Sequence, residues 1–383
     1  GWGPSGVAPW FEAINQRVHI ETSPPVTPVS RAFIDSSINL GLPERNFRDG
    51  IAAGAGMFPL NARGIYRESS SAAYLHPLDA LPVNLTVLCN TRADKILFDG
   101  NRAIGCRTGA GEFTAGKEIL LCCGAIQTPQ LLAVSGVGPG SVLKQLGIPL
   151  VADLGGVGNN LIDHTSANVV YSTREPLPQW EWTLCESTLM INVNDNAPAP
   201  ELLYHFVLGV RNKYPDRDNP FPGNSVKISP NVTRPRSRGH LEFVSPAVDD
   251  PPLIHLNYLS DPEDYDISTL VKGLRFGREV ANTAPLSEFL GEELAPGLGV
   301  VSDRELAEYA RDTCETVYHP SGTCRMGTDA DAVVSPDLKV HGLQNLRVCD
   351  ASVFPTMVTV NINNTVMMVA EKAAAEIIRD HSG

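Results

Sequence analysis

The sequence predicts a mixed α/β fold, with α/β parts at both ends of the chain and a β-rich part between them. An apolar run at 118–121 leads through a glycine into a helical pattern at 130–132, which is the order of an α/β element. Between about 168 and 261, short strand-like runs with many prolines favour a separate sheet. A buried-strand run at 346–349 then precedes an apolar helix at 365–379.

The other elements follow from local periodicity and turn residues. We expect strands at residues 85–88, 95–98, 202–207, 225–228 and 240–244, and helices around 33–40, at 268–282 and at 303–313. Ser302 precedes the last of these helices, and Glu305 follows it by three residues, which is the spacing of a capping box. The run 119–123, which contains Cys122 and Cys123, is predicted to be a buried strand.

Composition and charge exclude several classes of protein. The chain has 383 residues, 43% of them hydrophobic and 19% charged, which is typical of a globular protein with one large or two medium domains. A net charge of -13 argues against a nucleic-acid partner, because an acidic surface repels phosphate. No apolar run approaches the ~18 residues of a membrane span, and no signal segment opens the chain, so we expect a soluble protein.

The eight cysteines are too few and too scattered for a disulfide scaffold. We therefore expect all eight to be reduced thiols. A metal site at Cys314, His319 and Cys324 is not favoured, since their spacing fits no common zinc pattern. A hydrolase built on Ser321 is not favoured either, because the chain has no Gly-x-Ser-x-Gly motif.

The segment 124–138 is the most specific pattern in the chain. Its small residues would let a strand end and a helix start approach a flat ligand, since glycine permits backbone distances that a side chain blocks. On the strength of the glycines alone, a tight strand-to-helix connection without a ligand is the better interpretation. A match over the whole segment to a single known pattern favours the ligand.

Two polar residues offer the parts that alcohol oxidation needs. His319 can accept a proton near neutral pH, and Asn361, at the start of the closing helix, provides an amide. A lone histidine is more often structural, so the pair gains weight only from its flanking residues.

These segments together resemble the glucose-methanol-choline (GMC) oxidoreductases, flavoproteins that bind FAD and oxidise alcohols. The similarity extends over essentially the whole chain, and it is strongest to the choline-oxidising members of the family. The matching blocks are residues 64–70, 84–87, 124–138, 155–164 and 350–355, with further similarity at 230–233, 237–239, 316–320 and 358–361.

The resemblance implies a role for individual residues. His319 would accept the hydroxyl proton while hydride passes to flavin N5, and Asn361 would hold the alkoxide oxygen. The residues implied to bind FAD are Ala93, Asp350, Ala351, Asn363, Asn364 and Thr365. Those implied to line the substrate pocket are Tyr318, Asn194 and Arg234.

Two departures from the family pattern bear on these roles. Residues 362–364 follow Asn361 where the family usually has a proline, which leaves Asn363 as an alternative, although Asn361 keeps the better register. Asn194 takes the position where choline oxidases carry a glutamate for the trimethylammonium group. Because an amide cannot neutralise a quaternary cation, choline is not the favoured substrate.

The family's Gly-x-Gly-x-x-Gly dinucleotide turn has no counterpart in the chain. We therefore expect a separate polypeptide, the N-terminal part of the same precursor, to complete the FAD site. Within this chain, residues 1–165 and 300–383 are expected to form the remaining FAD-binding domain, and residues 166–299 the β-rich substrate domain.

The resemblance implies an FAD-dependent enzyme that oxidises a primary alcohol to an aldehyde, with oxygen or another acceptor reoxidising the flavin. Two alternatives remain open. Relatives on the same scaffold act as lyases or decarboxylases, and a truncated remnant could bind partners without catalysis. The intact His319 and Asn361 argue against the remnant.

Overall fold

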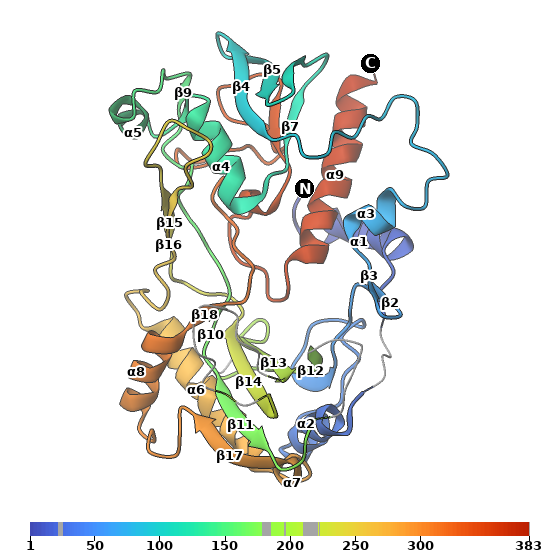
Figure 1. Cartoon of the computed structure of the whole chain (residues 1–383), viewed down its shortest axis with the longest axis vertical. Helices are drawn as coiled ribbons and strands as arrows, with labels where there is room; N and C mark the ends of the chain where they lie inside the picture. The colour runs from blue at the N-terminus through green and yellow to red at the C-terminus, as the bar shows by residue number, and fades with distance from the viewer. Residues whose placement is uncertain (22–25, 178–184, 195–196, 210–220, 222, 383) are drawn as a thin grey trace.

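The computed structural model describes residues 1–21, 26–177, 185–194, 197–209, 221 and 223–382. The chain forms two halves stacked along the long axis of the molecule (Figure 1). One half is built on a large antiparallel sheet, and the other holds the closing helix α9 and a short parallel sheet.

The large sheet has eight strands in the order β1-β12-β13-β14-β10-β18, with β11 joining β14 to β17. Its strands are β1 (Gly54–Met57), β10 (Thr165–Ser166), β11 (Val169–Thr173), β12 (Cys185–Ile191), β13 (Leu202–Leu208), β14 (Ser225–Val232), β17 (Leu290–Ala295) and β18 (Glu315–Thr316). The central strand β13 alternates little between buried and exposed, so both faces of the sheet are covered.

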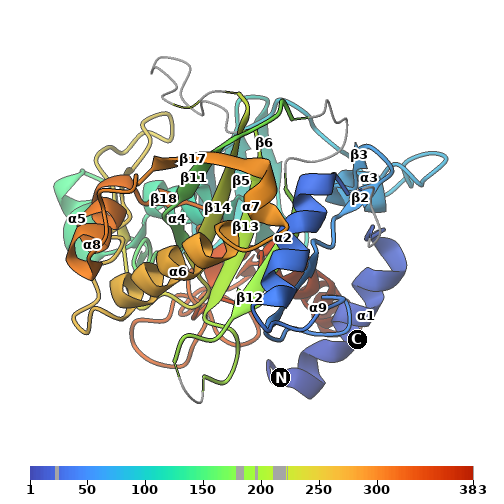
Figure 2. The same ribbon diagram turned by 90° about the horizontal axis from the view of Figure 1, so that it is seen from below.

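Helices cover the outer face of this sheet, as Figure 2 shows from below. They are α2 (Pro28–Asn39), α6 (Tyr265–Ala281), α7 (Leu286–Phe289) and α8 (Asp303–Thr313). Phe33 of α2 stacks on Phe206 of β13 with ring centroids 4.5 Å apart, at the centre of this core. The expected capping box is confirmed, because Ser302 and Glu305 bond reciprocally at the start of α8.

The other half is held together by α9 (Asn363–His381), which packs against α1 (Pro4–Arg17). Strand β7 (Ile119–Leu121) pairs in parallel with β19 (Leu346–Val348) and leads into α4 (Gly124–Val134). A three-stranded sheet consists of β4 (Ala93–Asp99), β5 (Arg102–Thr108) and β6 (Gly111–Thr114). The smaller elements are β2 (Ala62–Arg63), β3 (Tyr66–Arg67), α3 (Ser70–Tyr74), β8 (Val137–Gly138), α5 (Gly140–Gln145), β9 (Ala152–Asp153), β15 (His240–Glu242), β16 (Leu253–His255) and the 3₁₀ turn η1 (Ala351–Val353).

Most predicted elements are confirmed within one to a few residues, and all eight cysteines are free thiols. Two predictions are wrong. Residues 85–88 form no strand and are exposed, because no neighbouring strand pairs with them. Cys122 and Cys123 follow β7 on the surface rather than inside it, since β19 covers only one edge of that strand.

The chain has two main hydrophobic cores, one in each half. The core of the large sheet draws on residues between 166 and 299 and also on Phe33, Ala55 and Leu306. Helix α2, strand β1 and helix α8 therefore belong structurally with the sheet. In the described part of the chain, no helix combines the length and the hydropathy that crossing a bilayer requires.

Candidate active site

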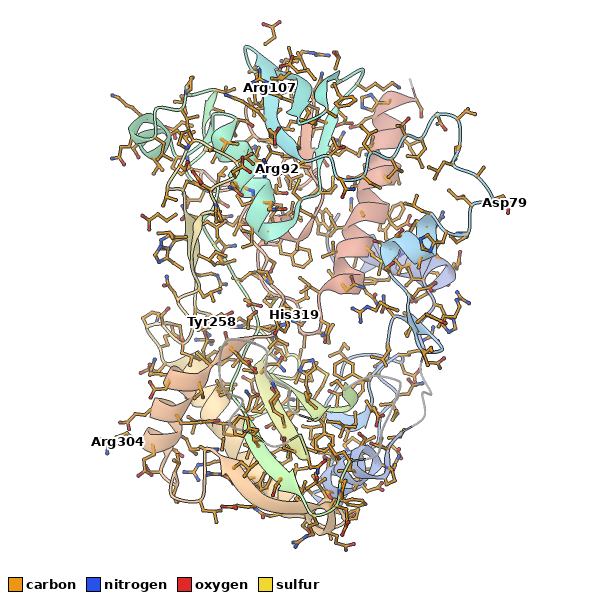
Figure 3. The ribbon with its side chains drawn as sticks, viewed as in Figure 1. Asp79, Arg92, Arg107, Tyr258, Arg304 and His319 are labelled. Carbon is orange, nitrogen blue, oxygen red and sulfur yellow. The ribbon has the colours of Figure 1, made fainter. Side chains whose placement is uncertain are left out.

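Two buried histidines face each other where the two halves meet. The Nδ1 atoms of His164 and His319 lie 2.8 Å apart, and the two rings stand edge to face at 85°. His164 is 1% exposed and His319 is 8% exposed. Figure 3 shows His319 beside the end of the sheet, directly below the other half of the molecule.

A bulged antiparallel pairing brings the two histidines together. Residues 162 and 321 form one bridge, while β10 and β18 pair a few residues away. Between these two pairings, residues 163–164 face the longer segment 317–320, so the longer side must bulge. Tyr318 takes the left-handed conformation with φ 64°, which turns the following residue toward His164.

Gly322 permits this close approach of the two segments. Its φ is 87°, and a Cβ atom at this position would lie 2.5 Å from the carbonyl oxygen of Asn160. Glycine is therefore required by both conformation and space.

A buried carboxylate orders the loop that carries His319. Asp163 accepts hydrogen bonds from the hydroxyls of Tyr258 and Thr316, each at 2.5 Å, and from the backbone N–H of His319 at 2.9 Å. Burial raises the pKa of Asp163, and the three donors oppose that shift. The carboxylate thus fixes the backbone at the histidine itself.

The hydrogen bonds determine which nitrogen of each histidine carries a proton. His164 Nε2 lies 2.9 Å from the carbonyl oxygen of Thr233 and 3.0 Å from that of Val358, and a carbonyl can only accept. His164 is therefore protonated at Nε2, and in the neutral ring its Nδ1 is an acceptor. His319 must then donate from Nδ1, which leaves His319 Nε2 unprotonated.

Both rings are neutral at pH 7. Burial lowers the pKa of His164, and burial together with the neighbouring His164 and His205 lowers the pKa of His319 to about 3. The site consequently presents an unprotonated imidazole nitrogen at His319 Nε2.

The side-chain amide of Asn361 faces that nitrogen. Its Nδ2 lies 3.2 Å from His319 Nε2 and donates to it. The structure thus brings Asn361, rather than the alternative Asn363, to His319. An amide donor and an imidazole acceptor at this distance can serve the same oxygen atom of a ligand.

A cavity of about 520 Å³ adjoins Asn361. Its described lining is mostly apolar and includes Phe47, Phe58, Met190, Leu203 and Val360. The start of α9 forms another wall with Asn363, Asn364 and Thr365, three of the predicted FAD residues. No side chain caps this helix at Ile362, so backbone N–H groups stay available at its positive end.

The lining suits a flavin ring. A flat aromatic system with carbonyl groups on one edge needs apolar walls and hydrogen-bond donors, and the cavity combines both. Residues 361, 363, 364 and 365 are the ones that would hold it.

The remaining predicted FAD residues lie elsewhere. Ala93 lines a separate cavity of about 240 Å³ with Arg92 and Gln127. Asp350 is buried and accepts from the Gly124 N–H at 2.9 Å and the Thr128 hydroxyl at 2.6 Å, at the start of α4. A carboxylate there stabilises the helix N-terminus, and the adjoining Ala351 is buried too.

The predicted substrate residues separate into two places. Tyr318 precedes His319 but is 65% exposed. Asn194 and Arg234 share a third cavity of about 550 Å³, whose described lining includes neither His319 nor Asn361. Their assignment to the alcohol stays a prediction.

Sequence reasoning gave no role to Asp163 and His164, although both stand in the matching block 155–164. Two adjacent polar residues, Asp and His, within that block were the one sign in the sequence that these positions matter. Their function depends on the pairing of this segment with the loop around residue 320, which is distant in sequence.

Comparisons with known proteins agree with the predicted family. Two family models described as GMC oxidoreductase match residues 1–166 and 235–370. Choline oxidase of Arthrobacter globiformis is 37% identical over 94% of this chain and 68% of its own length. An oxygen-dependent choline dehydrogenase of Escherichia coli is 35% identical over 93% of the chain and 69% of its own length.

Solved structures confirm the predicted fold. Pyridoxine 4-oxidase from Mesorbium loti superposes with a TM-score of 0.91 at 29% identity, over 99% of this chain and 78% of that one. Formate oxidase, at 24% identity and a TM-score of 0.86, shares the fold over 96% of this chain and 73% of its own. The chain belongs to the GMC oxidoreductase family and is an FAD-dependent alcohol oxidoreductase.

Proposed function

We propose that the enzyme oxidises a primary alcohol to an aldehyde, with His319 Nε2 as the proton acceptor. The observation that carries the proposal is the hydrogen-bond chain that starts at the Thr233 and Val358 carbonyls and leaves His319 Nε2 unprotonated. FAD, when bound, supplies the hydride acceptor at N5. Removal of the hydroxyl proton by His319 would provide the electrons that expel hydride from the carbon.

Asn361 would orient the alcohol and stabilise the charge that develops on its oxygen. Its Nδ2 lies 3.2 Å from His319 Nε2, so an alcohol oxygen bound beside both groups would accept from Asn361 and donate to His319. An amide does not compete for the proton. His319 would therefore accept the proton, and Asn361 would stabilise the charge on the alcohol oxygen.

His164 would act as a positioning residue. It is buried and does not line the cavity. Its Nδ1 accepts the hydrogen bond from His319 Nδ1, which keeps the His319 proton on Nδ1 and away from Nε2. Such a partner fixes the tautomer and the orientation of the catalytic ring.

The substrate class that we infer is an uncharged alcohol with an apolar body. Arg48 is the one charged residue among the described residues that line the cavity, and the rest are apolar, amide-bearing or, at Thr188 and Thr365, hydroxyl-bearing. A permanent cation would gain no carboxylate here and would meet an arginine. Choline, which the names of the relatives mention, is therefore not the favoured substrate of this chain.

A further dinucleotide-binding unit would complete the FAD site in the other half of the molecule. The support is an exposed apolar run that includes Val83, Leu85, Val87 and Leu88. Apolar surface of this kind marks a contact with protein. Intact-mass measurement of the purified yellow enzyme would decide whether that unit is a separate chain; a single chain of one mass would contradict a separate one.

Anaerobic mixing of the FAD-bound enzyme with alcohol tests the proposal. We expect His319→Asn to retain FAD and to slow flavin bleaching near 450 nm by roughly 10²–10⁴-fold, the contribution of general base catalysis. His76→Asn, at an exposed histidine on the surface, is the control and should bleach at the wild-type rate. Fast bleaching by His319→Asn would rule out His319 as the base.

A further inference from the structure

Two asparagine side chains meet on the wall of the cavity beside Asn361. Asn61 Nδ2 donates a hydrogen bond of 2.9 Å to Asn364 Oδ1, and both residues line the cavity. Asn61 comes directly before strand β2, whereas Asn364 lies in the first turn of α9, 303 positions later in the sequence. The hydrogen bond therefore joins two walls of the cavity that meet only in the folded chain.

Backbone hydrogen bonds hold Asn61 in place on both sides. Its carbonyl oxygen accepts from the Glu68 N–H at 2.9 Å, at the open end of the hairpin that β2 and β3 form. The preceding residue, Leu60, exchanges backbone hydrogen bonds with Glu21. Asn61 thus reaches α9 from an ordered backbone, so little conformational freedom is lost when its amide bonds the helix.

The direction of the side-chain hydrogen bond sets the orientation of the Asn364 amide. An asparagine carries an acceptor oxygen at one end of its amide and two N–H donors at the other. Since Asn364 Oδ1 accepts from Asn61, its Nδ2 is turned away from Asn61. Within the described ranges, the Asn364 side chain makes no other hydrogen bond, so its two N–H donors remain available to a ligand in the cavity.

The start of α9 provides further donors. No side chain caps the helix at Ile362, so its first backbone N–H groups are open, and the helix dipole makes this end positive. Such a wall favours a ligand that presents acceptors, as the carbonyl groups of a flavin ring do. An Asn364 amide turned by 180° would present its oxygen instead, and two acceptors cannot form a hydrogen bond. The orientation that Asn61 selects is the one that suits the cofactor.

We propose that Asn61 is a positioning residue for the flavin. By donating to Asn364 Oδ1, it keeps the Asn364 N–H donors directed at the acceptor groups of the ring. Donors at the ring stabilise its electron-rich reduced form, so the orientation of Asn364 also sets how readily the flavin is reduced. The inference rests on the flavin lying in the cavity beside Asn361, where the walls of α9 and residues 58–61 face it.

The reduction equilibrium between the FAD-bound enzyme and a redox dye of known potential tests the proposal. We expect Asn364→Leu to shift this equilibrium toward oxidised flavin by roughly tenfold, because the ring loses its side-chain donors. Asn61→Leu, which is similar in size but has no donor, should shift it in the same direction by roughly threefold to tenfold. Asn61→Asp can only accept from Asn364 and should shift it further than Asn61→Leu.

A double-variant cycle separates positioning from a general effect on structure. In the Asn364→Leu background, Asn61→Leu should cause no further shift, because Asn61 acts through the Asn364 amide. Asn39→Asp is the matched control. The Asn39 side chain also donates at 2.9 Å to another segment, at the Ala284 carbonyl, but it lies on α2 in the half that holds the large sheet. This variant should keep the wild-type equilibrium.

Three outcomes would overturn the proposal. Asn61→Leu could leave the equilibrium unchanged although Asn364→Leu shifts it, or it could cause equal shifts in both backgrounds. An equilibrium that Asn364→Leu does not change would place the flavin away from this wall, and the inference would fail with that placement. Asn61→Ala decides the matter if Asn61→Leu does not fold. Because no alcohol takes part in the measurement, the result does not depend on the role of His319.

Discussion

The proposed role of His319 as a base depends on where its hydrogen bonds lead. Its Nδ1 proton points to His164, whose own proton is fixed by two backbone carbonyls. Backbone carbonyls cannot donate, so groups that do not titrate set the direction of every hydrogen bond in this series. At the residue scale, the reactivity of one nitrogen follows from its neighbours rather than from the histidine itself.

This arrangement predicts different effects for two substitutions of His164. In His164→Asn the side-chain oxygen takes the place of Nδ1 as an acceptor, and we expect kcat/KM for the alcohol to stay within about tenfold of wild type. His164→Leu removes the acceptor and should cost roughly 100-fold in kcat/KM, with a smaller change in KM. Equal losses in both variants would show that His164 contributes packing alone.

The neutral state of the two histidines predicts a loss of stability in acid. Burial lowers the pKa of both rings, and that of His319 falls to about 3, so between pH 6.5 and about 3 the unfolded chain binds a proton that the folded His319 does not. The free energy of unfolding should fall by ~1.4 kcal/mol per pH unit from His319 as the pH decreases through this window, and His164 adds to the loss in the same direction. Stability is fully retained above pH 6.5.

Urea unfolding at several pH values checks this. His319→Asn should show a shallower decline between pH 6 and pH 4 than the wild type, and the exposed-site control His76→Asn should follow the wild type. Parallel curves for His319→Asn and the wild type would contradict the neutral buried pair.

At the scale of elements, the site depends on a bulge between two short pairings. Strands β10 and β18 are two residues long, and the bridge between residues 162 and 321 closes the other side. The extra residues on the longer side place His319 opposite His164. Asp163 holds the loop by accepting a hydrogen bond from the backbone N–H of His319. A one-residue change in register would separate the two rings.

Gly322→Ala tests the bulge. The new Cβ would lie 2.5 Å from the Asn160 carbonyl at a φ of 87°, so we expect a loss of roughly 1–3 kcal/mol in the free energy of unfolding and a clear loss of kcat. Gly299→Ala is the matched control, because a Cβ there would meet nothing within 4 Å. Thermal unfolding and steady-state rates of both variants distinguish the outcomes, and equal behaviour would show that the segments can separate without cost.

At the scale of the whole molecule, α9 links the catalytic cavity to the remote end of its half. Its first turn lines the cavity beside Asn361, and Asp380 near its end bonds the buried guanidinium of Arg347 at 2.6 Å. Arg347 also bonds Glu118, just before β7, at 2.8 Å. One cation therefore ties the helix to the short parallel sheet.

Removal of this cation should destabilise that half strongly. Arg347→Met leaves Glu118, whose side chain is 9% exposed, without its main partner, and we expect a loss of roughly 3–5 kcal/mol. Adding Glu118→Leu should restore much of this loss, because an apolar pair replaces a buried ion pair at little cost. Thermal unfolding of the single and double variants measures the difference. The control is Arg304→Gln, at an arginine that is 84% exposed. If Arg347→Met is as stable as this control, the ion pairs of Arg347 contribute little.

The sequence by itself determined the family and the α/β-to-β-to-α/β order, and it selected His319 and Asn361 as candidates, because local patterns and motifs encode them. It failed at residues 85–88 and 122–123, where the pattern predicts a strand but burial depends on partners distant in the chain. Only the tertiary structure decided the contacts of His164 and Asp163 with the loop of His319 and the absence of a proton on His319 Nε2. Each of these depends on hydrogen bonds between segments far apart in sequence, and their geometry is set by folding rather than by local propensity.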